Sequence, residues 1–211
     1  MSSENFVHLH VHTEYSMLDG AARVGDLMAE VKAQRMPAIA MTDHGNVFGA
    51  FEFYKAAKKA DVKPIIGIEA YVAPESRFDK KRVQWADGGE DDVSGGGAYT
   101  HMTILAENNE GLANLFRLSS LASLEGYYYK PRMDRELLAI YAKGLIATTG
   151  CPGGEIQTRL RMGAYKEAIK AASAYRDIFG KENFYLEIMD HGIEIEARVK
   201  ADLMKLGKEL G

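Results

Sequence analysis

At 211 residues, with 46% apolar and 27% charged residues, the chain has the size and composition of one soluble globular domain. A net charge of −4 argues against a broad nonspecific nucleic-acid surface, which needs many unopposed lysines and arginines. No apolar run approaches a membrane span and the N-terminus lacks a secretory signal pattern, so we expect a cytoplasmic protein without membrane contact. The single cysteine, Cys151, excludes an internal disulfide.

Apolar runs typical of β-strands alternate with amphipathic helical patterns, which is the signature of βα units. The predicted strands cover residues 6–12, 38–42, 64–72, 99–106, 144–149 and 184–189. The predicted helices cover residues 24–34, 48–60, 109–124, 155–162, 165–179 and 193–210, with a further short helix capped by Asp134. We therefore expect one α/β domain over residues 1–211.

Two features of the sequence depart from this alternation of strands and helices. Residues 74–98 are charged, glycine-rich and aperiodic, which predicts a long surface loop inserted in the domain. The sequence also stops directly after a helix, although such a helix should return to another parallel strand. We expect the chain to be a C-terminally truncated piece of a longer protein.

The segment HLHVHTEYSMLDG, residues 8–20, carries three of the six histidines at alternate positions. On an extended strand, His8, His10 and His12 would project from one face. Buried neutral imidazoles each need a polar partner, and a metal ion can serve several of them at once. Asp19 could bring a carboxylate to the same place.

Four more candidate ligands lie on or beside predicted strands: His44, Glu69, His101 and Cys151. In barrels of βα units, reactive groups gather at the C-terminal ends of strands. Taken singly, a lone histidine or buried cysteine is more often structural than functional. Glu69 is different, because a carboxylate flanked by an apolar run would be nearly buried and would need a cation or strong hydrogen bonds.

Together with the N-terminal histidines and Asp19, these residues form a mixed nitrogen, oxygen and sulfur ligand set. Such a set suits zinc, with manganese or iron as alternatives. There are too many candidates for one tetrahedral site, so we expect two or three divalent metals with Glu69 as a bridging carboxylate.

Five motifs carry a specific resemblance: HLHVHTEYSMLDG, AMTDHGN, KPIIGIEAYV, YTHMTILAEN and TTGCPGGEIQTRL. They resemble, in family order, the N-terminal PHP (polymerase and histidinol phosphatase) domain of the alpha subunit of bacterial DNA polymerase III. The resemblance covers essentially the whole chain. It implies a distorted (βα)7 barrel with up to three metals, whose matching ligands are His10, His12, Asp19, His44, Glu69, His101 and Cys151.

The family completes its ligand set with an Asp-x-His motif on the last strand, which this chain lacks. By the resemblance, His10, His12, Glu69 and the late Asp hold a first metal, whereas Asp19, His44 and the late His hold a second. The third uses Glu69, His101 and Cys151. We expect the third site to tolerate the missing strand best and the second worst, and His8 to be a structural neighbour.

His101 stands at the beginning of its predicted strand. In a parallel barrel, that end would face away from the site. Either residues 99–106 run antiparallel to the strand that contains Glu69, or the strand begins later than residue 99, and we favour the first.

The resemblance implies metal-dependent phosphoester hydrolysis, acting as 3′–5′ exonuclease proofreading in a DNA-directed DNA polymerase of replication. Glu69, Asp19 and His44 would form the catalytic centre, where bound metals can activate water. The implied partners are the 3′ end of a DNA primer-template and the remaining polymerase domains. Replicase subunits such as the sliding clamp would bind through regions absent from this chain.

The tyrosine-rich segment 127–132 offers substrate contacts. Lys130 and Arg132 could hold a phosphate, and the tyrosines at 127–129 could stack a base. Solvation at the surface is the competing interpretation for these residues. It is the one we favour for four cations of the long loop, namely Arg77, Lys80, Lys81 and Arg82.

Two other functions stay open. The domain could be a catalytically silent, metal-stabilised part of the polymerase, and the fragment by itself could be inactive. Alternatively, the chain could be a free-standing phosphatase of the histidinol-phosphatase kind.

Overall fold

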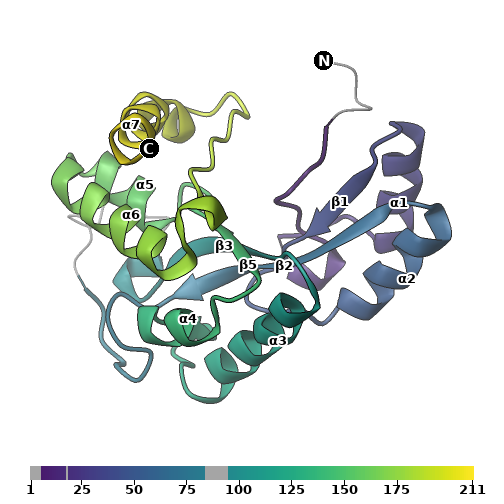
Figure 1. Ribbon diagram of the computed structural model, residues 1–211, viewed down its shortest axis with the longest axis horizontal. Coiled ribbons are helices and arrows are strands. Elements are labelled where there is room, and N and C mark those ends of the chain that lie inside the picture. Colours follow the sequence, from purple (N-terminus) through teal and green to yellow (C-terminus); the bar gives the residue numbers. More distant parts are fainter. Residues whose placement is uncertain (1–5, 18, 84–94) are drawn as a thin grey trace.

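The computed structural model describes residues 6–17, 19–83 and 95–211, and a mixed six-stranded sheet forms the centre of this part of the chain (Figure 1). The strands are β1 Ala38–Met41, β2 Lys63–Val72, β3 Thr100–Ala106, β4 Arg132–Met133, β5 Leu145–Thr148 and β6 Phe184–Tyr185. The helices are α1 Val24–Ala33, α2 Ala50–Ala60, α3 Asn109–Leu124, α4 Arg135–Tyr141, α5 Glu155–Arg161, α6 Tyr165–Phe179 and α7 Glu194–Leu210. Short 3-10 turns occur at Glu14–Ser16, Gly95–Gly97 and Lys181–Asn183.

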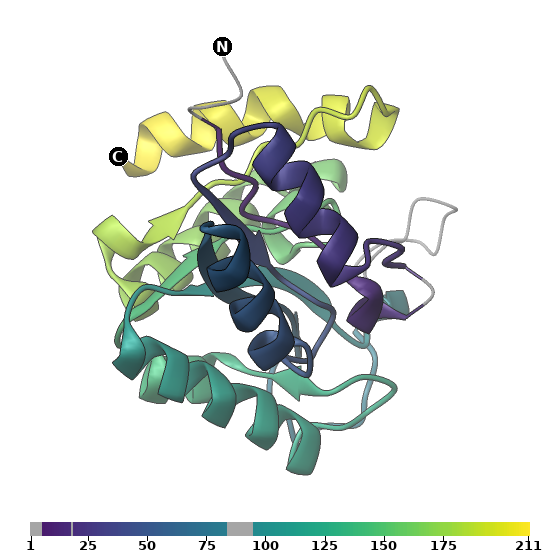
Figure 2. The same cartoon turned by 90° about the vertical axis from the view of Figure 1, so that its right-hand side faces the viewer.

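The strand order is β1-β2-β3-β5-β6, with β4 pairing with β2 off this path. β1, β2 and β4 run parallel, as do β5 and β6, whereas β3 is antiparallel to both β2 and β5. Helices cover the outside of the sheet in three groups, α1 with α2, α3 with α4, and α5 with α6 and α7 (Figures 1 and 2). The predicted α/β class is confirmed, and the arrangement is that of a distorted βα barrel.

Side-chain caps mark the beginning of two of the described α-helices. The side chains of Asn108 and Asp134 cap α3 and α4 by accepting hydrogen bonds from the backbone N–H groups of Gly111 and Leu137, at 3.0 and 2.9 Å. The helices then bury their apolar faces, as Phe53 of α2 does at 0% exposure. Among the described residues, no helix has the length and apolar character needed to cross a bilayer.

The N-terminal segment is not the strand predicted for residues 6–12. The N–H groups of Ala40 and Thr42 donate to the carbonyls of His8 and Val11, at 2.9 and 2.8 Å. The two donors are two residues apart, whereas the two acceptors are three residues apart. The N-terminal segment therefore has one residue too many for a regular ladder, as in a β-bulge. The segment follows β1 in an irregular, extended form.

This irregularity separates His8 from the other two histidines. His8 is exposed, and its ring packs edge-on against Phe6 with 4.8 Å between centroids. The expectation that three imidazoles share one face is therefore wrong for His8. His10 and His12 do turn toward the same carboxylate.

The last predicted strand is also shorter than expected. Of residues 184–189, only β6 pairs with β5, and the N–H of Thr149 still donates to the carbonyl of Tyr185 at 3.0 Å. The N–H of Glu187 instead donates to the hydroxyl of Thr149, at 3.0 Å. A side chain thus replaces the next backbone acceptor, and the ladder ends there.

The antiparallel direction predicted for the strand of His101 is confirmed. In the β2–β3 register, Glu69 faces Thr103 and Tyr71 faces His101. The beginning of β3 therefore lies beside the end of β2. Of the predicted loop 74–98, residues 74–83 and 95–98 are described and contain no helix or strand beyond the 3-10 turn Gly95–Gly97, while residues 84–94 lie outside the described part of the chain.

The predicted phosphate contact of Arg132 is wrong. This residue belongs to β4 rather than to a loop, and it is completely buried at 0% exposure. Its guanidinium donates to four backbone carbonyls, those of Arg77, Asp79, Ala98 and Gly126. Arg132 therefore fastens both flanks of the long loop to the sheet.

The prediction that Arg77 is solvated at the surface is also wrong, because this residue is buried. It lies 8% exposed and forms ion pairs with Asp134 at 3.0 Å, Glu125 at 2.7 Å and Glu136 at 3.0 Å. These contacts join the loop to α3 and α4. The neighbouring loop cations are exposed, as expected, namely Lys80, Lys81 and Arg82.

Replacing Arg132 with methionine should lower the free energy of unfolding by about 3 kcal/mol or more, because it leaves buried carbonyls without a donor. Urea denaturation measures this change. The matched control is Lys130→Met, two residues away and exposed, which should cost less than about 0.5 kcal/mol. Equal midpoints for the two variants would contradict the structural role of Arg132.

Candidate metal site

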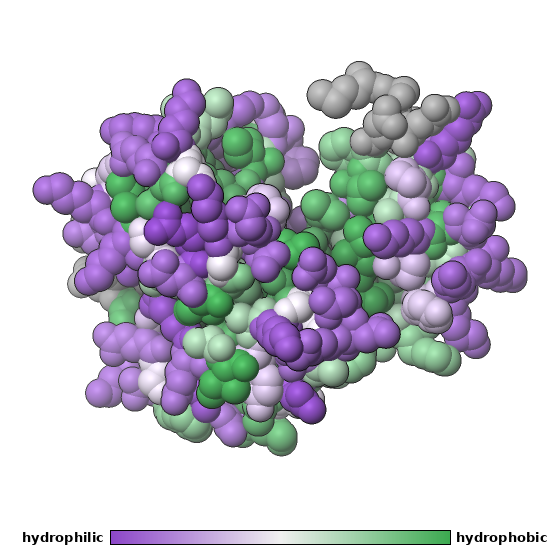
Figure 3. Space-filling model, in the orientation of Figure 1, coloured by the Kyte–Doolittle hydropathy of each residue, from purple (hydrophilic) through white to green (hydrophobic). Residues whose placement is uncertain are grey.

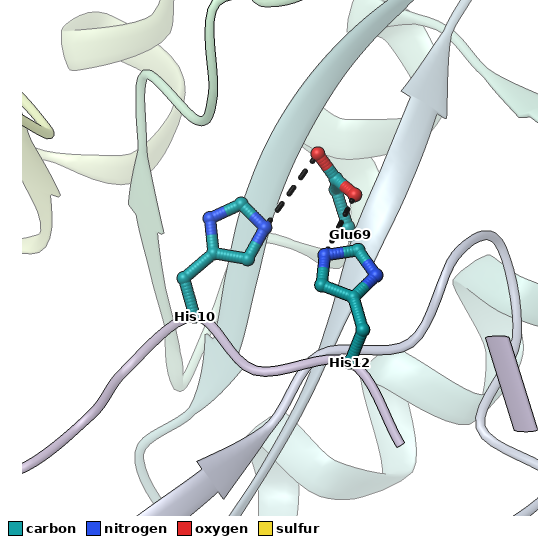
Figure 4. A group of neighbouring side chains, drawn as sticks. All are labelled: His10, His12 and Glu69. Atoms are coloured by element: carbon teal, nitrogen blue, oxygen red, sulfur yellow. Dashed lines mark ion pairs between the residues drawn. The ribbon is translucent and has the colours of Figure 1, made fainter. Parts of the chain in front are cut away.

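Glu69 lies at the centre of the candidate site. Its side chain on β2 is 1% exposed, which confirms the predicted burial, and four imidazoles surround it. The carboxylate oxygens lie 3.5 Å from His10 Nε2, 3.2 Å from His12 Nε2, 2.6 Å from His44 Nδ1 and 3.0 Å from His101 Nδ1. Figure 4 shows His10 and His12 reaching from the N-terminal segment toward different oxygens of Glu69.

Separate backbone elements deliver the other two imidazoles. His44 follows β1, and the N–H of the next residue, Gly45, donates to the carbonyl of Glu69 at 2.9 Å. Gly45 has φ of 65°, and a Cβ there would lie 2.7 Å from the ring of Tyr71, so this turn requires glycine. His101 comes from the start of β3, opposite Tyr71.

Within the described residues, ligand atoms converge in three overlapping groups. These are His10 with His12 and Glu69, His12 with Asp19 and His44, and His44 with Glu69 and His101. The atoms of each group lie within 4.8 Å of one another, which is compact enough for an ion between them. The grouping differs in part from the one implied by the family, because His12 joins Asp19, and His44 takes the place of Cys151.

Asp19 reaches the site from an exposed loop. Its carboxylate contacts Nε2 of His44 while the side chain remains 70% exposed. The loop is held by the next residue, Gly20, where a Cβ would lie 1.9 Å from the carbonyl oxygen of Thr13. Asp19 therefore forms the solvent-facing edge of the cluster.

Two atoms at the centre indicate that the cluster is suited to a cation. His44 Nδ1 and Glu69 Oε2 face each other as an ion pair at 2.6 Å, and neither atom has a hydrogen-bond partner outside the cluster. Buried polar atoms are seldom left in this state, because each costs free energy. A divalent metal accepts lone pairs from both imidazole and carboxylate, so the donor set fits such an ion.

Cys151 lies at the inner end of the cluster. Its Sγ is 3.3 Å from His101 Nδ1 and accepts from the N–H of Gly153, also at 3.3 Å. Burial, together with the charge of Glu69, raises the pKa of the thiol well above its usual value. Without a cation the sulfur is therefore a thiol, and binding a metal would require loss of that proton.

The charges of the cluster are strongly coupled. Burial lowers the pKa of His10, but the carboxylates of Glu187 and Glu69 outweigh this effect and raise it to about 10. Burial raises the pKa of Glu69, but the imidazoles of His10, His101 and His44 hold it well below its usual value. Without metal, Glu69 is therefore ionised and His10 is a cation at neutral pH.

His12 is held from behind by the hydroxyl of Ser16 and, through it, by Asp43. Its Nδ1 lies 3.3 Å from the hydroxyl of Ser16, which donates to the buried carboxylate of Asp43 at 2.6 Å. The same carboxylate accepts from the N–H and the hydroxyl of Thr13, both at 2.7 Å. This network directs Nε2 of His12 toward Glu69.

The sequence interpretation missed Glu187. This carboxylate lies 2.6 Å from Nδ1 of His10 and is 15% exposed. A signal was present, because Glu187 lies between Leu186 and Ile188 in a predicted strand. The reasoning that singled out Glu69, a carboxylate in an apolar strand, applies to it equally.

The cluster opens into a cleft of about 1290 Å³. Asp19, His44, His101 and Lys130 line it. Aromatic side chains form much of its wall, namely Tyr15, Phe48, Tyr71, Tyr99 and Tyr127.

A second hollow, of about 980 Å³, lies between the N-terminal segment and the chain after β6. His10 and Glu187 both line it, along with apolar side chains such as Ile65 and Leu105. Figure 3 shows the molecule hollowed between these two parts, with apolar residues at the surface of the depression. The inner face of the sheet is thus accessible from this side.

The sequence matches the PHP domain family over residues 8–191, which include all seven predicted ligands. The chain belongs to the PHP family. Its curated relatives include the DNA polymerase III alpha subunits of Saccharopolyspora erythraea, 64% identical, and Mycobacterium leprae, 59% identical, each matched over 100% of this chain. The relative from Thermus aquaticus is 47% identical over the same share.

This PHP domain spans only 17–18% of the length of those three relatives. A crystal structure from Bifidobacterium adolescentis, described as that of a metal-dependent phosphoesterase, superposes with a TM-score of 0.54 at 14% identity. The superposition covers 97% of this chain and 84% of the chain in that crystal structure. At that identity, the likeness concerns the fold.

Metal binding should release protons. Because a metal takes a neutral imidazole, His10, with its pKa of about 10, must lose its proton. Affinity should therefore rise with pH through the neutral range, by up to about tenfold per unit for one proton. Calorimetry in buffers of different ionisation enthalpy would measure the proton count.

The control for this measurement is His8→Asn, outside the cluster, which should leave the proton count unchanged. His10→Asn should reduce it by one. An affinity that is independent of pH would contradict the expected charge of His10.

Proposed function

We propose that this PHP domain hydrolyses phosphodiester bonds, acting as a metal-dependent 3′–5′ proofreading exonuclease within a DNA polymerase III alpha subunit. The observation that carries the proposal is the set of four imidazoles whose nitrogens lie 2.6–3.5 Å from the buried carboxylate of Glu69. A domain that only needed a stable core would be better served by apolar residues there. The relatives are named as DNA polymerase III alpha subunits, which supports placing the domain within such a polymerase.

Two or three divalent metals, zinc or alternatively manganese or iron, are the proposed cofactors. When bound, they would activate a water molecule and offset charge on the phosphate. Glu69 would bridge between ions, because both of its oxygens face imidazoles. His44 and the exposed Asp19 would hold the ion nearest the cleft. His10, His12, His101 and Cys151 would complete the protein's ligand set.

Lys130 is the proposed phosphate contact. Its side chain is exposed, and Nζ lies 5.5 Å from the ring centroid of Tyr71. That ring stacks on His44, at 6.0 Å between centroids, so Lys130 stands beside the cluster. Tyr127, 60% exposed in the same cleft, could stack the terminal base.

The partners in this proposal are the 3′ end of a DNA primer-template and the remaining polymerase domains. Replicase subunits such as the sliding clamp would act through those other domains, in the cytoplasm. The chain's modest negative charge suits this view, since broad contacts to duplex DNA would then lie elsewhere.

The test is digestion of a 3′-mismatched primer by the full-length protein. Glu69→Ala should reduce the excision rate on the order of 100-fold or more, because it removes the central ligand of the cluster. Removal of metal with a chelator should have a similar effect.

The matched control is Glu75→Ala, which removes an exposed carboxylate from the nearby loop and should leave excision unchanged. Thermal unfolding of both variants checks that the fold is retained. Excision that is unaffected by Glu69→Ala would rule out proofreading by this site and favour a silent structural domain.

A further inference from the structure

Glu187 is anchored more firmly than a surface carboxylate would be. Its Oε2 accepts from the hydroxyls of Thr103 on β3, at 3.1 Å, and Thr148 on β5. Its backbone N–H donates to the hydroxyl of Thr149. Two threonines thus hold the carboxylate and a third holds the backbone of a residue that belongs to no regular strand.

These threonines belong to the same row as the candidate site. In the sheet register, Thr103 faces Glu69 on one side and Thr148 on the other. Directly paired residues project from the same face of a sheet, so the row continues from Glu69 across two strands to the carboxylate of Glu187. This row positions Glu187 on the far side of His10 from Glu69.

His10 is therefore held between two carboxylates. Its Nδ1 lies 2.6 Å from Glu187 Oε1, and its Nε2 lies 3.5 Å from Glu69 Oε1. A neutral imidazole has one N–H and one lone pair, so an acceptor at Nδ1 leaves the lone pair at Nε2. That lone pair then points into the group formed by His10, His12 and Glu69.

His12 gives an internal comparison. Its Nδ1 faces the neutral hydroxyl of Ser16, at 3.3 Å, rather than a carboxylate. A carboxylate behind a metal-binding imidazole orients the ring and makes it a stronger donor to the ion. The two histidines are therefore supported unequally.

We propose that Glu187 is a positioning residue that fixes His10 as the Nδ1–H tautomer and strengthens Nε2 as a ligand for the ion shared with His12 and Glu69. This inference deepens the proposed function and rests on it, since it concerns the same metals. Glu187 itself does not contact the ion, because its carboxylate lies behind the imidazole.

The experiment titrates zinc into the metal-depleted full-length protein against a chelating indicator. Glu187→Gln keeps the size and an acceptor but loses the charge, and it should weaken zinc binding about 10-fold. Glu187→Ala should weaken it further, toward about 100-fold. The matched control is Glu182→Gln, at an exposed glutamate five residues earlier, which should bind as wild type does.

A second readout separates positioning from loss of structure. With cobalt(II) in place of zinc, the visible absorption of the ion reports its ligand field, which Glu187→Gln should shift while thermal unfolding stays unchanged. Zinc affinity and cobalt spectrum equal to wild type in Glu187→Gln would overturn the inference. An unaltered spectrum with a lowered unfolding temperature would also overturn it, by assigning Glu187 a structural role.

These outcomes are distinct from those for the proposed function. If the Glu187 variants weaken metal binding but the wild-type protein excises no mismatched nucleotide, the positioning role stands and proofreading fails. If excision occurs and Glu187→Gln binds metal normally, proofreading stands and the positioning role fails.

Discussion

A charged carboxylate inside the sheet is the constraint on which the rest of this structure depends. Glu69 is 1% exposed on a strand whose neighbouring residues are apolar, and a charge in that place needs partners. Four imidazoles supply them, and the closest pair of atoms, His44 Nδ1 and Glu69 Oε2, has no hydrogen-bond partner outside the cluster. Groups that would be unfavourable in an ordinary core are therefore concentrated where one or more cations can satisfy them together.

The reversed strand β3 makes this concentration possible. In a fully parallel barrel, reactive groups come from the C-terminal ends of strands. Here β1 and β2 contribute from such ends, whereas β3 contributes His101 from its beginning, which lies beside the turn that carries Cys151. One antiparallel strand thus adds a candidate ligand, His101, that a parallel strand in the same position would direct to the opposite edge.

Around the candidate site, some groups support other side chains and others are open to the cleft. Glu187 and the Ser16–Asp43 pair hold His10 and His12 from behind. Arg132 and Lys130, two residues apart, divide in the same way, since one is saturated by backbone carbonyls and the other is exposed at the cleft. Neighbouring cations in a sequence can therefore have unrelated roles.

The sequence by itself determined the α/β class, the helix cap at Asp134, the burial of Glu69 and the candidate residues that gather around it. The class, the cap and the burial follow from local propensity and from the cost of burying a carboxylate, both of which can be read from short segments, whereas the antiparallel direction of β3 was inferred from the need for His101 to face the site. Tertiary structure alone decided that His8 turns outward, that Arg132 is buried and that Glu187 supports His10. Each of these depends on contacts between segments far apart in the chain: the irregular pairing with β1, the carbonyls of the long loop, and the threonines of β3 and β5. No local pattern specifies such contacts, because they exist only once the sheet has brought the segments together.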